Sequence, residues 1–310
     1  MRVLVTGANG GLGRNVVEAA SKRGHAVRAL VRDASRAPPI EGVEWISADA
    51  NDVAQVTSAA RDCDALFHLV NVRFTADWVR STAALLDVAI AACRATGARL
   101  VFPGNVWIYG RGVGAPVGED AQPAPCSTKG RARLDKERKL RSSGVRFVII
   151  RLPEFYGPHV QTLTGPPLAA IARGTTATWF GPPDVPVELV YMPDAAAALV
   201  EIGLGAADGD VFHLPGVETT TPRRFLSLAT EISGRGSLRF VPAWVVRAAA
   251  LVHGRAREFA DILHLWTDPV LLDGTKVRSR YPDLPTTSYR SGLAETLAWL
   301  RRNPDARMHY

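Results

Sequence analysis

A glycine-spaced turn, which joins an N-terminal apolar run to a helical pattern, is the strongest constraint in this chain. Residues 3–13 read VLVTGANGGLG, which places Gly7, Gly10 and Gly13 at the spacing TGxxGxxG. In such a turn the first glycine allows a tight reversal, the second lets backbone approach a pyrophosphate, and the third lets helix pack on strand. The unpaired N–H groups of the helix start then favour phosphate oxygens. The segment predicts dinucleotide binding, with Asn9 and Leu12 beside the cofactor.

The first 150 residues alternate between apolar runs and amphipathic segments. The apolar runs predict strands at 3–6, 26–31, 43–47, 65–70, 99–103 and 146–151. Helical patterns separate them at 11–23, 52–60, 77–96 and 128–142. Continuous apolar strands between amphipathic helices are typical of a parallel sheet covered on both faces, with ligands at the strand carboxyl ends. The predicted fold class is therefore α/β, a Rossmann-type doubly wound parallel sheet.

The sequence pattern changes after residue 152, where prolines cluster and the helical patterns become shorter. We expect strands at 187–191 and 211–214, an alanine-rich helix to about residue 204, and helices near 222–233, 243–265 and 289–302. Residues 1–155 would form the NAD(P)-binding domain, joined by the strand and helix of 186–215. Residues 156–185 and 216–310 would form a smaller substrate lobe. The core of that lobe is expected to hold the aromatic side chains Trp179, Phe180, Trp244 and Trp266.

Composition excludes several classes of protein. The net charge of +7 comes from basic residues that are scattered apart from the run 129–141, without a recognition motif or interleaved aromatics. This favours attraction of a phosphorylated ligand over nucleic-acid binding. No apolar run reaches the ~18 residues of a membrane span, and nothing before the first strand reads as a signal peptide, so we expect no membrane association and a cytoplasmic location. The three cysteines lack metal-ligand spacing, which predicts reduced thiols and no metal site.

The residues after the second predicted strand, at 26–31, help to distinguish an NAD site from an NADP site. An acidic side chain there binds the ribose 2′-OH of NAD, whereas an arginine accepts the 2′-phosphate of NADP. Because a guanidinium matches phosphate geometry, Arg32 and Arg36 predict NADP(H), while Asp33 leaves NAD open. After the third strand, Asp49 is expected at the adenine amino group with Ala50 beside it. Asp52 either shares that role or caps the next helix.

With these motifs the chain resembles the short-chain dehydrogenase/reductase superfamily, in its extended or atypical branch of epimerases, dehydratases and reductases. The resemblance covers nearly the whole chain. Its segments are TGANGGLG at 6–13, FHLV at 67–70, VWIYG at 106–110 and RLPEFYGP at 151–158. It implies an NAD(P)-dependent enzyme in which Leu69 and Val70 contact the cofactor.

The catalytic pattern departs from that of the family. Extended members carry Ser or Thr four residues before the Tyr-Gly pair, where this chain has Asn105. They then carry Tyr-x-x-x-Lys at the start of the next long helix, and the segment here fits that register with Lys129 and Arg133. The resemblance therefore places Asn105, Lys129 and Arg133 at the catalytic centre. In isoflavone-reductase-like relatives a lysine on the equivalent helix is the catalytic base.

Lys129 has three interpretations. In the first, Lys129 acts as the acid/base group while Asn105 polarises a substrate oxygen. In the second, Lys129 and Arg133 bind the phosphate or ribose of the cofactor. In the third, the basic run at 129–141 is a solvated helix face. The weaker candidates are Tyr109 and Tyr156, each followed by glycine and able to donate a phenolic proton or to frame the site. The residues expected beside the substrate are Glu154, Tyr156 and His159.

The leading hypothesis is an NADP(H)-dependent oxidoreductase, a reductase of a small carbonyl, alcohol or activated C=C compound. One alternative is an epimerase or dehydratase of a sugar-like substrate with tightly held NAD. Another is a non-catalytic NADP-sensing regulator. The expected partner is a small molecule, and a homodimer would pair through helices 77–96 and 128–142.

Overall fold

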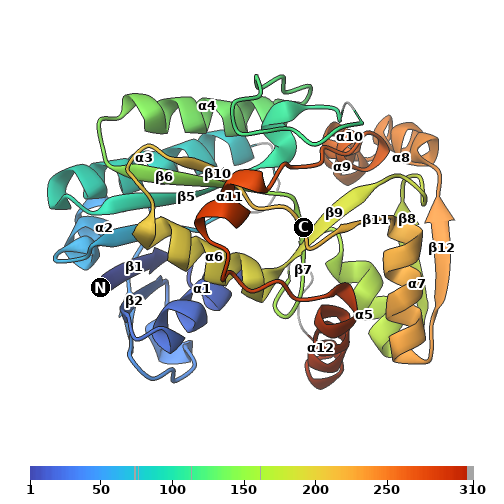
Figure 1. The fold of residues 1–310 in the computed structure, drawn as a ribbon, viewed down its shortest axis with the longest axis horizontal. Coiled ribbons are helices and arrows are strands. Elements are labelled where there is room, and N and C mark those ends of the chain that lie inside the picture. The colour runs from blue at the N-terminus through green and yellow to red at the C-terminus, as the bar shows by residue number, and fades with distance from the viewer. Residues whose placement is uncertain (73–74, 76, 113, 161, 306–310) are drawn as a thin grey trace.

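The computed structural model describes residues 1–72, 75, 77–112, 114–160 and 162–305. Seven strands form one parallel sheet in the order β10-β6-β5-β4-β1-β2-β3 (Figure 1). They are β1 (Arg2–Thr6), β2 (Ala26–Val31), β3 (Val43–Ser47), β4 (Ala65–His68), β5 (Arg99–Asn105), β6 (Phe147–Leu152) and β10 (Val211–His213). The strand order reverses between β1 and β4, which is the point where such sheets bind dinucleotides. The predicted fold class is confirmed.

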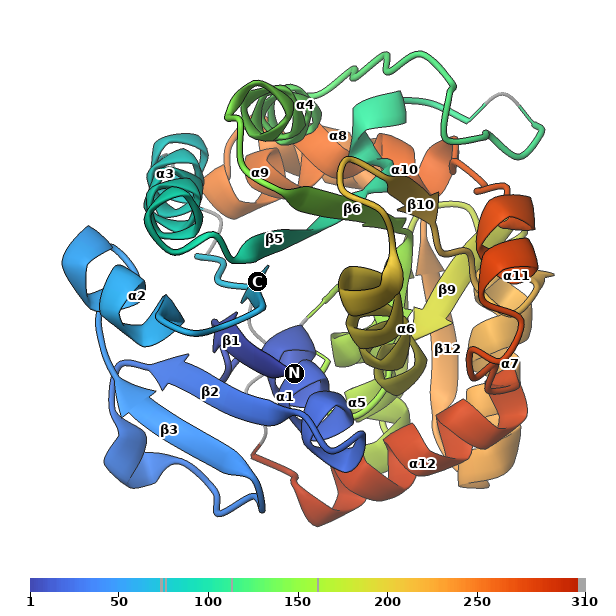
Figure 2. The ribbon, with the colours of Figure 1, turned by 60° about the vertical axis from the view of Figure 1, so that its left-hand side comes forward.

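Helices cover both faces of this sheet because successive strand residues point to opposite sides. Val3 and Val5 pack with α1 (Gly11–Lys22) and α6 (Met192–Gly205). Leu4 packs with α2 (Val53–Ala60), α3 (Trp78–Thr96) and α4 (Thr128–Ser142). Figure 2 shows these two groups of helices on either side of the strands.

Side-chain caps fix the starts of α4 and α2. At α4, Ser127 Oγ accepts the N–H of Gly130 at 3.0 Å. At α2, the Asp52 side chain is the cap, which confirms the capping alternative for Asp52.

A smaller lobe lies beyond the carboxyl ends of the large sheet (Figure 1). It holds a three-stranded sheet, β11-β9-β7, and a two-stranded sheet, β12-β8. Its strands are β7 (Glu154–Tyr156), β8 (Thr176–Phe180), β9 (Val187–Tyr191), β11 (Thr219–Thr220) and β12 (Ser237–Val241). Its helices are α5 (Gly165–Arg173), α7 (Pro222–Ser233), α8 (Ala243–Ala250), α9 (Gly254–Ile262), α10 (His264–Thr267) and α12 (Tyr289–Arg302). The chain also forms η1 (Ala34–Arg36), η2 (Val106–Tyr109) and α11 (Thr275–Arg280). The division into two domains stays a prediction.

Two expectations about the lobe are wrong. The single helix expected over 243–265 is broken into α8, α9 and α10, in keeping with the low helix propensity of Gly254. The four aromatic side chains do not share one core: Trp179 and Trp266 are buried and meet edge to face at 4.6 Å, whereas Phe180 is 43% exposed and Trp244 66% exposed. Within the described residues, no helix combines the length and the apolarity that a membrane span requires.

Candidate functional site

The glycine turn leaves no room for side chains. Gly7 has a φ of +74°, and a Cβ there would lie 2.6 Å from the backbone N of Val70. A Cβ on Gly13 would lie 2.0 Å from the Gly7 carbonyl oxygen. The helix α1 starts after Gly10, which brings no side-chain acceptor to the first N–H groups. Such a close-packed cradle with free helix donors fits a pyrophosphate, and the backbone at Leu69 and Val70 forms its far wall.

The groups expected around the adenosine lie at the ends of β2 and β3. Arg32 lines the central cavity, while Arg36 in η1 lies with its Nε 3.8 Å from Asp33 Oδ2. Asp49 accepts two N–H groups of Asn51, at 2.9 Å and 2.8 Å. These bonds hold the pKa of Asp49 below its ordinary value, which keeps the side chain an acceptor. The exposed Asn9 and the half-buried Leu12 and Ala50 complete the predicted cofactor set.

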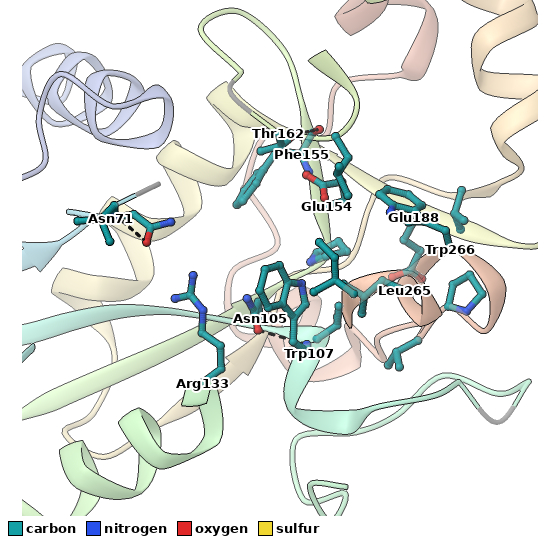
Figure 3. Close-up of a pocket in the computed structure, with 18 of the residues that line it drawn as sticks. Asn71, Asn105, Trp107, Arg133, Glu154, Phe155, Thr162, Glu188, Leu265 and Trp266 are labelled. Atoms are coloured by element: carbon teal, nitrogen blue, oxygen red, sulfur yellow. Dashed lines mark hydrogen bonds between the residues drawn. The ribbon is translucent and has the colours of Figure 1, made fainter. Parts of the chain in front are cut away.

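A cavity of about 470 Å³ lies where the large sheet meets the smaller lobe (Figure 3). Its walls are mixed, with somewhat more apolar than polar surface, and the apolar members include Trp107, Phe155, Ile262, Leu265, Trp266 and Val270. The polar members of its lining include Arg32, Asn71, Asn105, Arg133, Glu154 and Glu188. Its size and its few polar groups are typical of small-molecule sites. The motifs had indicated Arg32, Asn105, Arg133 and Glu154, whereas Asn71 and Glu188 had no sequence signal.

Arg133 reaches the cavity from α4. Its guanidinium carbon lies 5.3 Å from the ring centroid of Trp78 and 5.6 Å from that of Trp107, within cation–π range. Burial lowers the pKa of Arg133 to about 10, so the group remains a cation at neutral pH. Its buried Nε makes no hydrogen bond to any residue in the described part of the chain. Arg133 therefore offers a positive donor to a ligand oxygen.

Two amide side chains lie at the carboxyl ends of the neighbouring strands β4 and β5, one just after β4 and one at the last residue of β5. Asn105, at the end of β5, accepts the N–H of Trp107 on its Oδ1 at 3.2 Å. Asn71, after β4, accepts the N–H of Val72 at 3.0 Å and the indole N–H of Trp78 at 3.2 Å. Both side chains line the cavity (Figure 3). Because their oxygens are already fixed as acceptors, each amide nitrogen is the end suited to donate to a ligand.

Lys129 is held by carboxylates of α9. Its Nζ lies 2.7 Å from Glu258 Oε2 and 3.6 Å from Asp261 Oδ2. Asp261 also accepts the backbone N–H groups of Thr128 and Lys129, at 3.0 Å and 3.1 Å, at the start of α4. The Lys129 side chain is 5% exposed and is not among the described residues that line the cavity. Its catalytic and cofactor-binding roles stay predictions.

Three other predicted site residues also lie outside the described cavity lining. The Tyr109 hydroxyl lies 2.7 Å from His213 Nε2 and accepts from Arg151, and burial raises the pKa of Tyr109 to about 12. Tyr156 is fully buried among other aromatic rings of the lobe. The His159 ring packs on Trp299 at 4.6 Å between centroids. The structure thus does not bring these side chains together with Asn105 and Arg133, and their predicted roles remain untested.

Two carboxyl groups face the cavity from the lobe. Glu154 on β7 accepts the N–H of Phe155 at 3.1 Å, and burial raises the pKa of its carboxyl. Glu188 on β9 accepts the N–H of Leu272 at 3.1 Å, and burial raises the pKa of Glu188 to about 7. Neither forms an ion pair with a residue that the structure describes. A cavity lined by two half-buried carboxyls without an ion-pair partner in the described chain, and by Arg133, is a candidate reaction site.

Comparison with known proteins agrees with this geometry. Residues 7–164, which include the glycine turn, Arg32, Asn105 and Arg133, match the NAD(P)H-binding family. The chain belongs to this family. Membership confirms the predicted NAD(P)-binding enzyme class within the short-chain dehydrogenase/reductase superfamily. It does not decide between the two nucleotides.

Individual relatives extend the comparison. The chain is 36% identical over 176 residues to a 3-diazoavenalumate denitrifying reductase from Streptomyces sp, a match that covers 51% of this chain and 57% of that protein. It is 31% identical over 216 residues to a 2-alkyl-3-oxoalkanoate reductase from Stenotrophomonas maltophilia, with 64% of each chain covered. The fold matches the crystal structure of a dTDP-glucose 4,6-dehydratase from Streptomyces venezuelae with a TM-score of 0.81, at 19% identity and 98% coverage of both chains.

Proposed function

We propose that this protein is an NADPH-dependent reductase that acts on a small carbonyl or activated C=C compound. The observation that carries the proposal is one cavity that joins Arg32, at the end expected to hold the nucleotide, to Asn105 and Arg133. The Streptomyces and Stenotrophomonas relatives reported above are both named as reductases. The fold likeness to a dehydratase supports the architecture alone.

The chain's own residues divide the work. The glycine turn would bind the pyrophosphate, and Arg32 would bind the 2′-phosphate, with Arg36 nearby. When bound, the reduced nicotinamide supplies the hydride. Reduction of the substrate also takes up one proton, which solvent water or, in the interpretation tested below, Lys129 would supply. Asn105 would donate a hydrogen bond from its amide nitrogen to the substrate oxygen, while the Arg133 cation stabilises negative charge that develops there. The apolar walls formed by Trp107, Phe155 and Leu265 would limit the access of water to this region once ligands are bound.

The direct test is net oxidation of NADPH in the presence of aryl ketones, β-keto esters and enones. We expect turnover with at least one of these classes and release of NADP⁺. If NAD instead stays bound through purification and no substrate causes net oxidation, the epimerase or dehydratase alternative gains. If the nucleotide binds and no small molecule turns over, the regulator alternative gains.

The choice of nucleotide is tested at Arg32. We expect Arg32→Ala to weaken NADP⁺ by roughly 10- to 100-fold, because a charge-assisted phosphate contact is lost, while NAD⁺ changes little. Calorimetric titration of both nucleotides measures the difference. Arg302→Ala is the control and should bind both nucleotides as the wild type does, since Arg302 is exposed and lies outside the described cavity lining. Equal weakening of NAD⁺ and NADP⁺ in Arg32→Ala would contradict the assignment.

The role of Lys129 is tested by Lys129→Met. We expect this variant to lose about 1–3 kcal/mol of unfolding free energy, because Glu258 and Asp261 lose their partner while remaining partly exposed to water. Urea denaturation measures that loss. Turnover measured below the unfolding range then addresses acid/base work: loss of turnover with intact NADPH binding supports it, and unchanged turnover refutes it.

A further inference from the structure

The cavity is polarised along its length. In Figure 3, Arg133 and Asn71 lie on one side, whereas Glu188, Leu265 and Trp266 lie on the other. The first side adjoins the sheet end that would hold the nucleotide. The second is built by the smaller lobe, with Glu188 from β9 and Trp266 from α10. The substrate end thus combines a carboxyl group with apolar and aromatic walls.

Glu188 is poorly explained as a purely structural residue. Its Oε2 accepts the N–H of Leu272, which anchors the segment after Val270. Its Oε1 has no hydrogen-bond partner within the described part of the chain. Burial raises the pKa of Glu188 to about 7, and no described cation lies within ion-pair distance. Because a half-buried carboxyl without a counter-charge is unfavourable, a polar group from a ligand would stabilise it.

We propose that Glu188 selects substrates that carry a hydroxyl or amino group at the end opposite the reacting carbonyl, and that it excludes substrates with a carboxylate or phosphate there. The substrate class is a non-acidic, hydrophobic carbonyl compound with one such donor. Trp266 and Leu265 contact its apolar body, and Glu188 accepts the donor on Oε1. This inference rests on the proposed reductase function and adds the class of substrate.

The variants are chosen to separate charge from architecture. Glu188→Gln keeps an oxygen that can accept from Leu272 and removes the charge. Glu188→Lys reverses the charge toward the ligand. Glu41→Lys makes the same change of net charge at an exposed position outside the described cavity lining. Thermal unfolding of each variant checks the fold, and Glu188→Gln decides the result if Glu188→Lys fails to fold.

The probes are 4-hydroxyacetophenone and 4-acetylbenzoate, which differ in the group opposite the ketone. With NADPH at about pH 7.5, where Glu188 is largely ionised, we expect the wild type to favour the phenol by at least roughly 10-fold in kcat/KM. The reason is that a hydrogen bond to a charged group is gained and a like-charge contact is avoided. The preference should shrink in Glu188→Gln, reverse in Glu188→Lys and persist in Glu41→Lys. An unchanged preference in both Glu188 variants would overturn the proposal.

Binding distinguishes this proposal from the reductase function. Calorimetric titration of the same two compounds in the presence of NADP⁺ requires no turnover. If the phenol binds more tightly and the preference follows the charge at position 188, the selectivity proposal holds even when neither ketone is reduced. If neither compound binds the wild type, or both bind alike, the proposal is wrong although reduction of other ketones remains intact.

Discussion

Replacing Glu137 by Gln is expected to cost roughly 3–5 kcal/mol of unfolding free energy, the range for breaking one partner of a buried ion pair. Glu137 and Arg151 are 2% and 4% exposed, and Arg151 Nη2 donates to Glu137 Oε2 at 2.7 Å. Arg151 Nε donates to Oε1 of the same carboxylate at 3.2 Å. Glutamine keeps the shape of the side chain and leaves the buried guanidinium without its counter-charge.

The loss is large because Arg151 organises several elements at once. It also donates to the Tyr109 hydroxyl and, at 3.3 Å, to the carbonyl of Glu119. Domains of this kind are stable by only about 5–15 kcal/mol, so urea denaturation should show a marked fall in the midpoint. Asp135→Asn is the matched control on the same helix, since its pair with Arg138 is exposed and worth less than about 1 kcal/mol. Similar midpoints for the two variants would show that the buried pair does not stabilise the fold.

The second large effect is expected at the glycine turn. Gly13→Ala should weaken NADPH binding by roughly 100-fold, the scale expected for the loss of a hydrogen bond to a charged phosphate. The added Cβ would lie 2.0 Å from the Gly7 carbonyl oxygen, so the turn must move away from its phosphate-binding shape. Calorimetric titration with NADPH measures the loss of affinity.

The control for Gly13→Ala is a glycine that has room for a side chain. A Cβ on Gly254, at the first position of α9, meets no atom within 4 Å, and alanine favours a helix there. Gly254→Ala should therefore bind NADPH as the wild type does. If Gly13→Ala binds NADPH with wild-type affinity, the turn serves only the packing of α1 on the sheet and has no role in nucleotide binding.

Much of the fold could be predicted because local signals and tertiary structure agree. Helix α7 occupies 222–233 as predicted, and Thr221 Oγ1 accepts the N–H of Arg224 at its start. The strand at 187–191 is found with the predicted bounds. Strands β8 and β12 were missed: they pair only with each other, β8 has only two fully buried residues and β12 has none, so neither forms a continuous apolar run. Their pairing depends on contacts about 60 residues apart, as in Thr176 with Ser237.

The candidate site likewise contains residues that the sequence could predict and contacts that it could not. Asn105 and Arg133 follow from family spacing because both lie on elements whose positions the large sheet determines. The contacts of Lys129 could not be predicted, since its partners Glu258 and Asp261 are 129 and 132 residues downstream on a helix of the other lobe. Glu188 lay in a predicted strand, but the wall it faces depends on the pairing of β9 with β7 and β11.

The placement of Trp107 and Trp266 in the cavity wall gives the protein an intrinsic optical reporter. Reduced nicotinamide absorbs light in the region where indole emits, so nucleotide near Trp107 would quench its fluorescence by energy transfer. A compound beside Trp266 would change the polarity around a second indole. Trp244, which is 66% exposed on α8, would contribute a solvent-like emission that neither event alters.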